Sequence, residues 1–152
     1  MSEYHATVDW KRDGDFLKRR YSREHTLTFH GGLTVPGSAS PHIVPLPYSR
    51  ADALDPEAAF TGALSACHML WFLDIAARAG FAVAAYRDEA VGTLAPGAGG
   101  KQVMTRVVLR PKVTFEGETR PTASELEALH HAAHDECFLA NSVKTEVLVE
   151  IG

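Results

Sequence analysis

Cysteine is scarce in this sequence, and its scarcity narrows the chemistry that the chain can perform. The 152 residues contain two cysteines, Cys67 and Cys137. Neither a Cys-x-x-Cys pair nor a His-Glu-x-x-His motif is present, so the short signatures of common zinc sites are missing. In a reducing compartment two cysteines are poor candidates for a permanent disulfide. If they act together, we expect redox chemistry or metal binding.

Clusters of basic residues and targeting signals are also largely missing. The formal net charge is −4 with a pI of about 6.0, and basic residues are dispersed except at positions 18–20. Nucleic acid is therefore not an expected partner. The first ten residues lack the basic-then-apolar pattern of a signal peptide. We expect a soluble, cytoplasmic protein that does not associate with membranes.

Internal repeats and low-complexity segments are absent as well. The length fits one domain, and a hydrophobic content of 45% can bury a substantial core. We therefore expect a single domain over residues 1–152. The glycine-rich segment 97–100 is not followed by a Lys-Ser/Thr pair or a helix start. It predicts the tip of a hairpin and not a phosphate-binding loop.

The longest apolar run extends from Asp55 to Gly80 and predicts one long helix. Asp55 and Pro56 suit the N-terminal positions, and Gly80 supplies a left-handed stop. The opposite face holds mostly Ala, Met and Leu, so we expect the helix to be covered nearly all round. Helical spacing predicts an inward stripe made by Phe60, Leu64, Cys67, Trp71 and Ile75.

A second helix is predicted after a capping box formed by Thr122 and Glu125. It should end at Asn141 and Ser142. The predicted inward stripe of this helix consists of Leu126, Leu129, Ala133 and Cys137. Each cysteine is therefore expected on the packed face of a helix.

The remaining segments have the alternation or the β-branched content of strands. The two segments that flank residues 95–100 should form a hairpin, bent at Pro111. Two helices with segregated antiparallel strands predict an α+β fold. The predicted strands cover residues 4–10, 16–20, 23–30, 83–94, 102–115 and 143–151, and a proline-interrupted loop covers 33–54.

Cys67 and Cys137 form the first candidate site. Packing the two helices together could bring the sulfurs within bonding distance. One thiol could then attack a substrate while the other resolves the product. Alternatively, both residues are small buried hydrophobes. The pattern alone leaves both interpretations open.

A reactive Cys67 among apolar residues needs a positive charge nearby, because burial disfavours a thiolate. Arg20, Arg23 and Arg50 lie on elements that could cover the helix. A buried arginine needs a carboxylate partner, for which Glu57 is a candidate. Glu57 precedes Cys67 by ten residues, roughly 15 Å along a helix and about 80° out of phase. It could serve the cysteine of a second, antiparallel subunit, or it could simply complement the helix dipole.

Histidines provide the second candidate site. His130, His134 and Cys137 share one face of the second helix, and His68 follows the first cysteine directly. This spacing could hold Zn²⁺ if the two helices pack closely. Solvated or capping histidines are the alternative interpretation.

The quoted motifs resemble the family of osmotically inducible protein C and organic hydroperoxide resistance (OsmC/Ohr) proteins. The resemblance rests on Asp55-Pro56-Glu57 followed ten residues later by Ala66-Cys67-His68, and on the segments 130–142 and 143–147. It covers essentially the whole chain. It implies an α+β domain with antiparallel sheets around two central helices, in an intertwined homodimer with active sites at the subunit interface.

The resemblance also implies a thiol peroxidase that acts on organic hydroperoxides without a cofactor. Cys67 would be the attacking thiolate, which becomes a sulfenic acid, and Cys137 the resolving thiol that forms a Cys67–Cys137 disulfide. Glu57 would hold an arginine over the thiolate. Arg23 is the preferred candidate, with Arg20 and Arg50 as alternatives. The reductant would be a dithiol, such as that of a lipoylated protein.

Aromatic and aliphatic residues of the two helices favour an alkyl or lipid-derived hydroperoxide over hydrogen peroxide. The leading hypothesis is therefore a homodimeric, peroxiredoxin-like thiol-dependent hydroperoxide reductase. Two other classes remain. One is a metal-binding protein that uses the histidines and Cys137. The other is a non-catalytic dimer of the same fold whose loop at 33–54 lines a small-molecule pocket. In the peroxidase hypothesis, the expected preference for an alkyl or lipid-derived hydroperoxide rests on Phe60, Leu64, Trp71 and Phe138.

Overall fold

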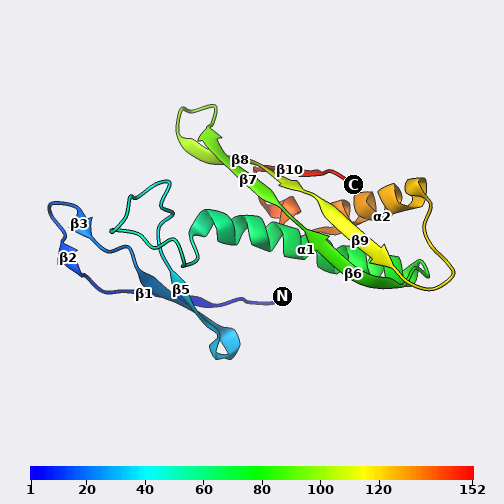
Figure 1. Ribbon diagram of the computed structural model, residues 1–152, viewed down its shortest axis with the longest axis horizontal. Helices are drawn as coiled ribbons and strands as arrows, with labels where there is room; N and C mark the ends of the chain where they lie inside the picture. Colours follow the sequence, from blue (N-terminus) through cyan, green and yellow to red (C-terminus); the bar gives the residue numbers. More distant parts are fainter. The chain divides into compact units, whose positions relative to one another are not determined.

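The structure is a computed structural model that describes residues 1–152. It combines two α-helices with several small sheets, as the predicted α+β class requires (Figure 1). The chain divides into two compact units, Met1–Ala59 and Phe60–Gly152, which are described separately. That the chain forms a single domain remains a prediction.

The first unit is built on a three-stranded antiparallel sheet. β4 lies in the centre and pairs with β1 on one side and with β5 on the other. A two-stranded hairpin extends beyond β1, and a short 3-10 helix (His30–Gly32) joins β4 to β5. The strands are β1 (Ala6–Trp10), β2 (Gly14–Asp15), β3 (Arg20–Tyr21), β4 (His25–Phe29) and β5 (Thr34–Gly37).

Two predictions for this unit are wrong. The segment 16–20, expected to be a strand, is mostly a turn, because Arg19 adopts a positive φ of 61° and its amide bonds back to the Phe16 carbonyl at 2.9 Å. The loop expected over 33–54 contains β5 at its start. Pro36 is compatible with β5 because β5 is an edge strand, where a missing amide donor costs little.

Helix α1 (Pro56–Arg78) confirms the predicted long helix and its two ends. The Asp55 carboxylate accepts a hydrogen bond from the Ala58 amide at 2.8 Å, and Gly80 adopts a φ of 86°. By length and composition alone α1 is apolar enough to cross a membrane, a test that the core helix of a soluble protein can also pass.

The predicted inward stripe of α1 is only partly correct. Leu64 is buried, and Phe60, Trp71 and Ile75 pack at the edges of the core clusters. Cys67, Trp71 and Ile75 are only half-buried. The helix is also not covered all round within one chain, because Leu70 is 63% exposed. The buried stripe instead consists of Leu64, His68, Phe72 and Ala76, spaced four residues apart.

The second unit contains the predicted hairpin, which bends midway. Its base is the β6–β9 pair and its tip is the β7–β8 pair (Figure 1). The pairing is interrupted between them, at residues 89–90 and at Arg110. The Asp88 carboxylate accepts a hydrogen bond from the Arg110 amide at 2.6 Å, directly before Pro111. The strands are β6 (Val83–Asp88), β7 (Val91–Pro96), β8 (Gln102–Leu109) and β9 (Pro111–Phe115).

The last strand, β10 (Glu146–Val149), is shorter than predicted and pairs with β8 in parallel. The expectation of purely antiparallel sheets is therefore wrong for this pair. Helix α2 (Ala123–Glu136) and a 3-10 helix (Ala140–Ser142) carry the chain back across the unit from β9. Such a crossover is what places β10 parallel to its neighbour.

Helix α2 begins as predicted, but it ends at Glu136 and not at the predicted Asn141 and Ser142. The Thr122 hydroxyl accepts a hydrogen bond from the Glu125 amide at 3.2 Å, and the Glu125 carboxylate accepts one from the Thr122 amide at 2.8 Å. Together these two bonds form a complete capping box. Leu129 and Ala133 of α2 pack with Phe72 and Ala76 of α1 in one hydrophobic cluster. This cluster fixes the two helices against each other.

Candidate functional site

The candidate site lies where the C-terminus of α2 meets the middle of α1. Cys137 is the C-cap residue of α2 and is 1% exposed, so it is buried as predicted but ends the helix. Its sulfur accepts a hydrogen bond from the Ala140 amide at 3.5 Å. Cys67 is half-buried near the centre of α1. Both cysteines are free thiols.

The two thiols interact. Burial raises the pKa of Cys137 to about 11, and a hydrogen bond with the Cys67 side chain raises it further. Cys137 is therefore a neutral thiol at physiological pH that lies within hydrogen-bonding reach of Cys67.

His68 lies directly beside this pair in sequence and points into the interior. Its Nε2 atom is 3.0 Å from Nδ1 of His130 on α2. The two rings are parallel to within 3°, and the His130 ring also stacks on Phe72 at a centroid distance of 4.2 Å. We call this pair, His68 and His130, the histidine bridge. Each of its residues is 1% exposed.

The histidine bridge is neutral at physiological pH. Burial lowers the pKa of both His68 and His130 to about 4. A neighbouring histidine lowers each pKa further. His134 acts on His68, and His68 acts on His130. Asp88 acts in the opposite direction on His68. Only one of two neutral imidazoles donates in the shared bond, so each ring keeps a second nitrogen for another partner.

The predicted metal site is not supported by this geometry. No group of three His, Cys, Asp or Glu side chains is arranged to hold a metal ion. His68 and His130 direct a nitrogen at each other and not at a common point. Buried nitrogens of His68, His130 and His134 have no hydrogen-bond partner within the chain, nor does the Tyr86 hydroxyl. The metal-binding interpretation of these histidines therefore has no support in this arrangement.

Glu57 lies in the first turn of α1 and is half-buried. This position suits a carboxylate that complements the helix dipole. It lies ten residues before Cys67 on the same helix, as the sequence required. The structure of one chain does not place Glu57 as a partner of Cys67.

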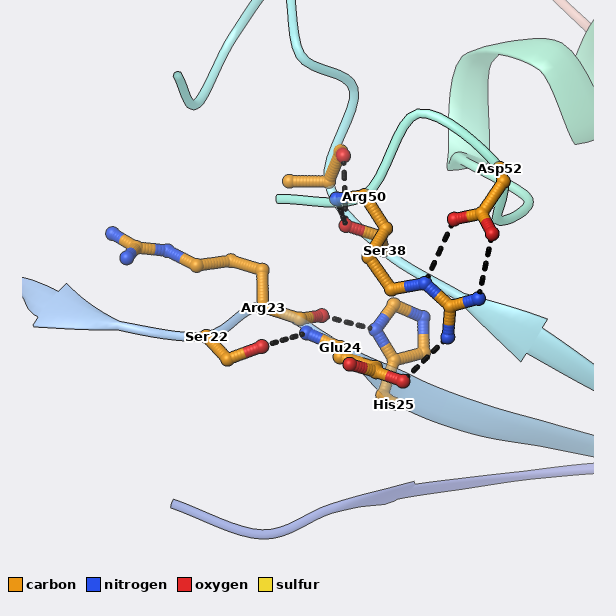
Figure 2. A network of polar contacts seen from close by, with 8 residues as sticks. Ser22, Arg23, Glu24, His25, Ser38, Arg50 and Asp52 are labelled. Carbon is orange, nitrogen blue, oxygen red and sulfur yellow. Dashed lines mark hydrogen bonds and ion pairs between the residues drawn. The ribbon is translucent and has the colours of Figure 1, made fainter. Parts of the chain in front are cut away.

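Among the candidate arginines, Arg50 is already paired with two carboxylates. Its guanidinium donates to Asp52 at 2.8 and 3.0 Å and to Glu24 at 2.5 Å (Figure 2). Asp52 and then Glu24 raise the pKa of Arg50 above its already high ordinary value, and Arg50 lowers the pKa of Asp52. This network anchors the loop before α1 to the start of β4.

Arg23 is placed differently, although it is next to Glu24 in sequence. Figure 2 shows its side chain directed away from the Arg50 network. The guanidinium donates to the carbonyl oxygens of Tyr21 at 2.6 Å and Arg19 at 3.3 Å, and it lies 3.7 Å from the centroid of the Tyr21 ring. Its charge is thus held against neutral groups. Arg20 is solvent-exposed.

Arg23 also lines a pocket of about 360 Å³ within the first unit. The walls are largely aromatic, because Trp10, Phe16 and Tyr21 pack edge to face or tilted with centroids 4.8 to 5.9 Å apart. A guanidinium beside an apolar wall suits a ligand with one polar end and one apolar end. The pocket lining also includes Val8, His25, Ser38, Ala39 and Pro56.

Sequence reasoning missed the histidine bridge and assigned its members to a metal site. The signal was present in the spacing of four from Leu64 to His68 and from His68 to Phe72 on α1. A histidine within such a stripe is expected to be buried and hydrogen-bonded. The identity of its partner, 62 residues away, could not be read from the sequence.

Comparisons with known proteins agree with the observed fold. The family model described as OsmC-like protein matches residues 49–152. An OsmC-like protein of unknown function from Vibrio cholerae has a structure with a TM-score of 0.98 and 52% identity, each chain covering 100% of the other. No protein with a curated description matches the chain.

Two more distant structures share the fold. An organic hydroperoxide resistance protein from Elizabethkingia anophelis has a TM-score of 0.73 at 16% identity, over 99% of this chain and 94% of that one. An organic hydroperoxide resistance protein of Bacillus subtilis has a TM-score of 0.69 at 17% identity, over 97% and 98%. The predicted α+β fold of this family is confirmed, and the chain belongs to the OsmC family.

Proposed function

We propose that this chain is a cysteine-based thiol peroxidase that reduces organic hydroperoxides. The observation that carries the proposal is the contact between Cys67 and Cys137, which pairs a half-buried thiol with a fully buried one. A peroxidatic thiol must be reached by substrate, whereas a resolving thiol need only meet the oxidised first thiol. This assigns attack to Cys67 and resolution to Cys137.

The cycle balances in three steps. The Cys67 thiolate attacks one peroxide oxygen, the O–O bond breaks, and the alkoxide takes a proton and leaves as an alcohol. Cys67 is then a sulfenic acid. Cys137 attacks its sulfur, and the hydroxyl group leaves with the Cys137 proton as water. The resulting disulfide is reduced to two thiols by an external dithiol, for which a lipoylated protein is our candidate.

Arg23 is our candidate for the cation that stabilises the Cys67 thiolate and the charge that develops on the peroxide oxygens. Its support is chemical: its guanidinium lies against neutral groups and an aromatic pocket, whereas Arg50 is neutralised by Glu24 and Asp52. Glu57 is proposed to hold that arginine. No cofactor is required by this cycle.

We further propose that the active form is a homodimer in the cytoplasm. Support comes from large apolar side chains that are exposed in one chain, among them Leu70 on α1 and Val8 on β1. A second subunit would bury such residues and would allow Glu57 and Arg23 of one chain to act on Cys67 of the other. The structural similarity to two organic hydroperoxide resistance proteins supports the choice of substrate class.

Steady-state reduction of tert-butyl hydroperoxide with a dithiol reductant tests the proposal. Cys67→Ser should abolish turnover, because the remaining thiol, Cys137, is 1% exposed and is not reached by the peroxide. Cys137→Ser should still be oxidised by the peroxide at Cys67 and should accumulate a sulfenic acid that dimedone traps. Its turnover should stop with a dithiol that reduces only the Cys67–Cys137 disulfide. Full turnover by Cys67→Ser, or a native protein that oxidises slowly and unselectively, would overturn the proposal and favour a non-catalytic binding dimer.

A further inference from the structure

Two side-chain contacts connect α1 with α2. The residues that make them are adjacent on α1 but well separated on α2. His68 and Cys67 are adjacent on α1, whereas their partners His130 and Cys137 are seven residues apart on α2. Seven residues are about two turns, roughly 10 Å along a helix. The helices are therefore held at two separate points, the histidine bridge and the thiol pair.

The histidine bridge leaves two polar nitrogens buried and unpaired in the chain. Its two rings are 1% exposed, and both keep a nitrogen without a partner in the chain. Burying an unsatisfied polar nitrogen costs free energy, and two apolar rings of similar shape would avoid that cost. What the imidazoles add is a directional bond between the helices, which apolar contacts do not supply.

A directional bond at one point restricts rotation and sliding of α1 against α2. The hydrophobic cluster of Phe72, Ala76, Leu129 and Ala133 holds the helices together but tolerates small shifts. A shift of about 1 Å is enough to separate two groups that must react. The hydrogen bond of 3.0 Å between His68 and His130 opposes that shift one residue away from Cys67.

We propose that the histidine bridge positions the thiol pair. By fixing the register of α1 on α2, it keeps the Cys67 sulfur facing the Cys137 sulfur and so raises their effective concentration toward each other. His68 and His130 are thus positioning residues that touch no substrate. The inference rests on the proposed function in taking the thiol pair as the reactive group.

The test measures the effective concentration of the two thiols from the equilibrium between the Cys67–Cys137 disulfide and a glutathione redox buffer, read by mass spectrometry. His130→Phe keeps the aromatic stack on Phe72 and removes the hydrogen bond. It should lower the effective concentration about tenfold, the ratio expected from losing one buried hydrogen bond. His130→Asn, whose amide can occupy the place of Nδ1, should stay within about threefold of the native value.

His131→Asn is the matched control, because His131 is the exposed neighbour of His130 on the same helix. This variant should leave the effective concentration of the two thiols unchanged. If His130→Phe does not fold, the double variant His68→Phe with His130→Phe, which leaves no bridge imidazole unpaired, should fold and show the same loss. A native effective concentration in the Phe variants would overturn the proposal. An equal loss in His130→Asn and His130→Phe would also overturn it, because the hydrogen bond would then not be the cause.

Glutathione replaces peroxide in this test. A native protein without peroxidase activity would therefore overturn the proposed function and leave the positioning result standing on its own.

Discussion

Nε2 of His68 and Nδ1 of His130 lie 3.0 Å apart, between ring planes that are parallel to within 3°, in an interior that excludes solvent from both. This relationship joins the two helices that carry the thiols. It also makes the stability of the protein depend on pH, because the bond depends on two rings that burial keeps neutral.

We expect the free energy of unfolding to fall as the pH is lowered from about 6.5 to about 4. The pKa of each bridge histidine is about 4 in the folded chain and 6.5 in an ordinary environment. Between these values the unfolded chain binds more protons, so stability is fully present above pH 6.5 and is lost toward pH 4. Each histidine contributes up to about 1.4 kcal/mol per pH unit.

Urea unfolding at pH 7.5, 5.5 and 4.5 measures this dependence. His134 and Asp88 also act on His68, so the control must remove the bridge and leave both in place. The double variant His68→Phe with His130→Phe does so and should have a distinctly flatter profile. Equal pH profiles for the native and double-variant proteins would contradict the assignment.

Replacing Arg23 should slow the peroxide step. Arg23→Met removes the charge but keeps much of the side-chain length, and we expect the rate constant for oxidation of Cys67 by an organic hydroperoxide to fall about 100-fold. Arg50→Met is the control, because Arg50 is held by Glu24 and Asp52, and its rate constant should stay within about threefold of native. A larger loss of rate in Arg50→Met than in Arg23→Met would make Arg50 the assisting arginine.

The capping box of α2 should contribute measurably to stability. Thr122→Ala removes the hydroxyl that accepts a hydrogen bond from the Glu125 amide. We expect the free energy of unfolding to fall by about 1 kcal/mol. Ser124→Ala, an exposed change in the same helical turn, should have little effect. Urea unfolding at pH 7.5 measures both, and equal midpoints for the two variants would show that the cap is dispensable.

Light scattering should give the mass of two 16.5-kDa chains. Leu70 is 63% exposed on α1 in one chain, and Leu70→Glu should shift the protein toward monomer because it places a charge in the proposed interface. Ala128→Glu, an exposed change on α2, is the control and should stay dimeric. A native monomer would contradict the dimer and, with it, the action of Glu57 and Arg23 across subunits.

The sequence predicted elements whose signals are local. The ends of α1 were marked by Asp55, Pro56 and Gly80, and the start of α2 was marked by Thr122 and Glu125. Pro111 marked the point where the pairing of the hairpin is interrupted. Each signal rests on a backbone requirement that one residue meets. The α+β class followed from the order of these elements, and the comparisons confirmed it.

What the sequence could not predict depends on partners far along the chain. The face of α1 that points inward was misjudged because apolar residues occur all round that helix, so periodicity alone could not distinguish Trp71 from Phe72. The parallel pairing of β10 with β8 depends on the path of α2. The histidine bridge joins residues 62 positions apart, and histidines in a helix also match metal-ligand spacing.

The central claim is that Cys67 and Cys137 form one redox pair, and a single turnover tests it most directly. Reduced protein is mixed with one equivalent of an organic hydroperoxide or of hydrogen peroxide, and thiol loss and mass are followed in time. The account predicts rapid loss of two thiols with a mass decrease of about 2 Da, faster with the organic hydroperoxide. Slow, unselective oxidation of both thiols, with oxygen added in place of the mass decrease, would contradict it.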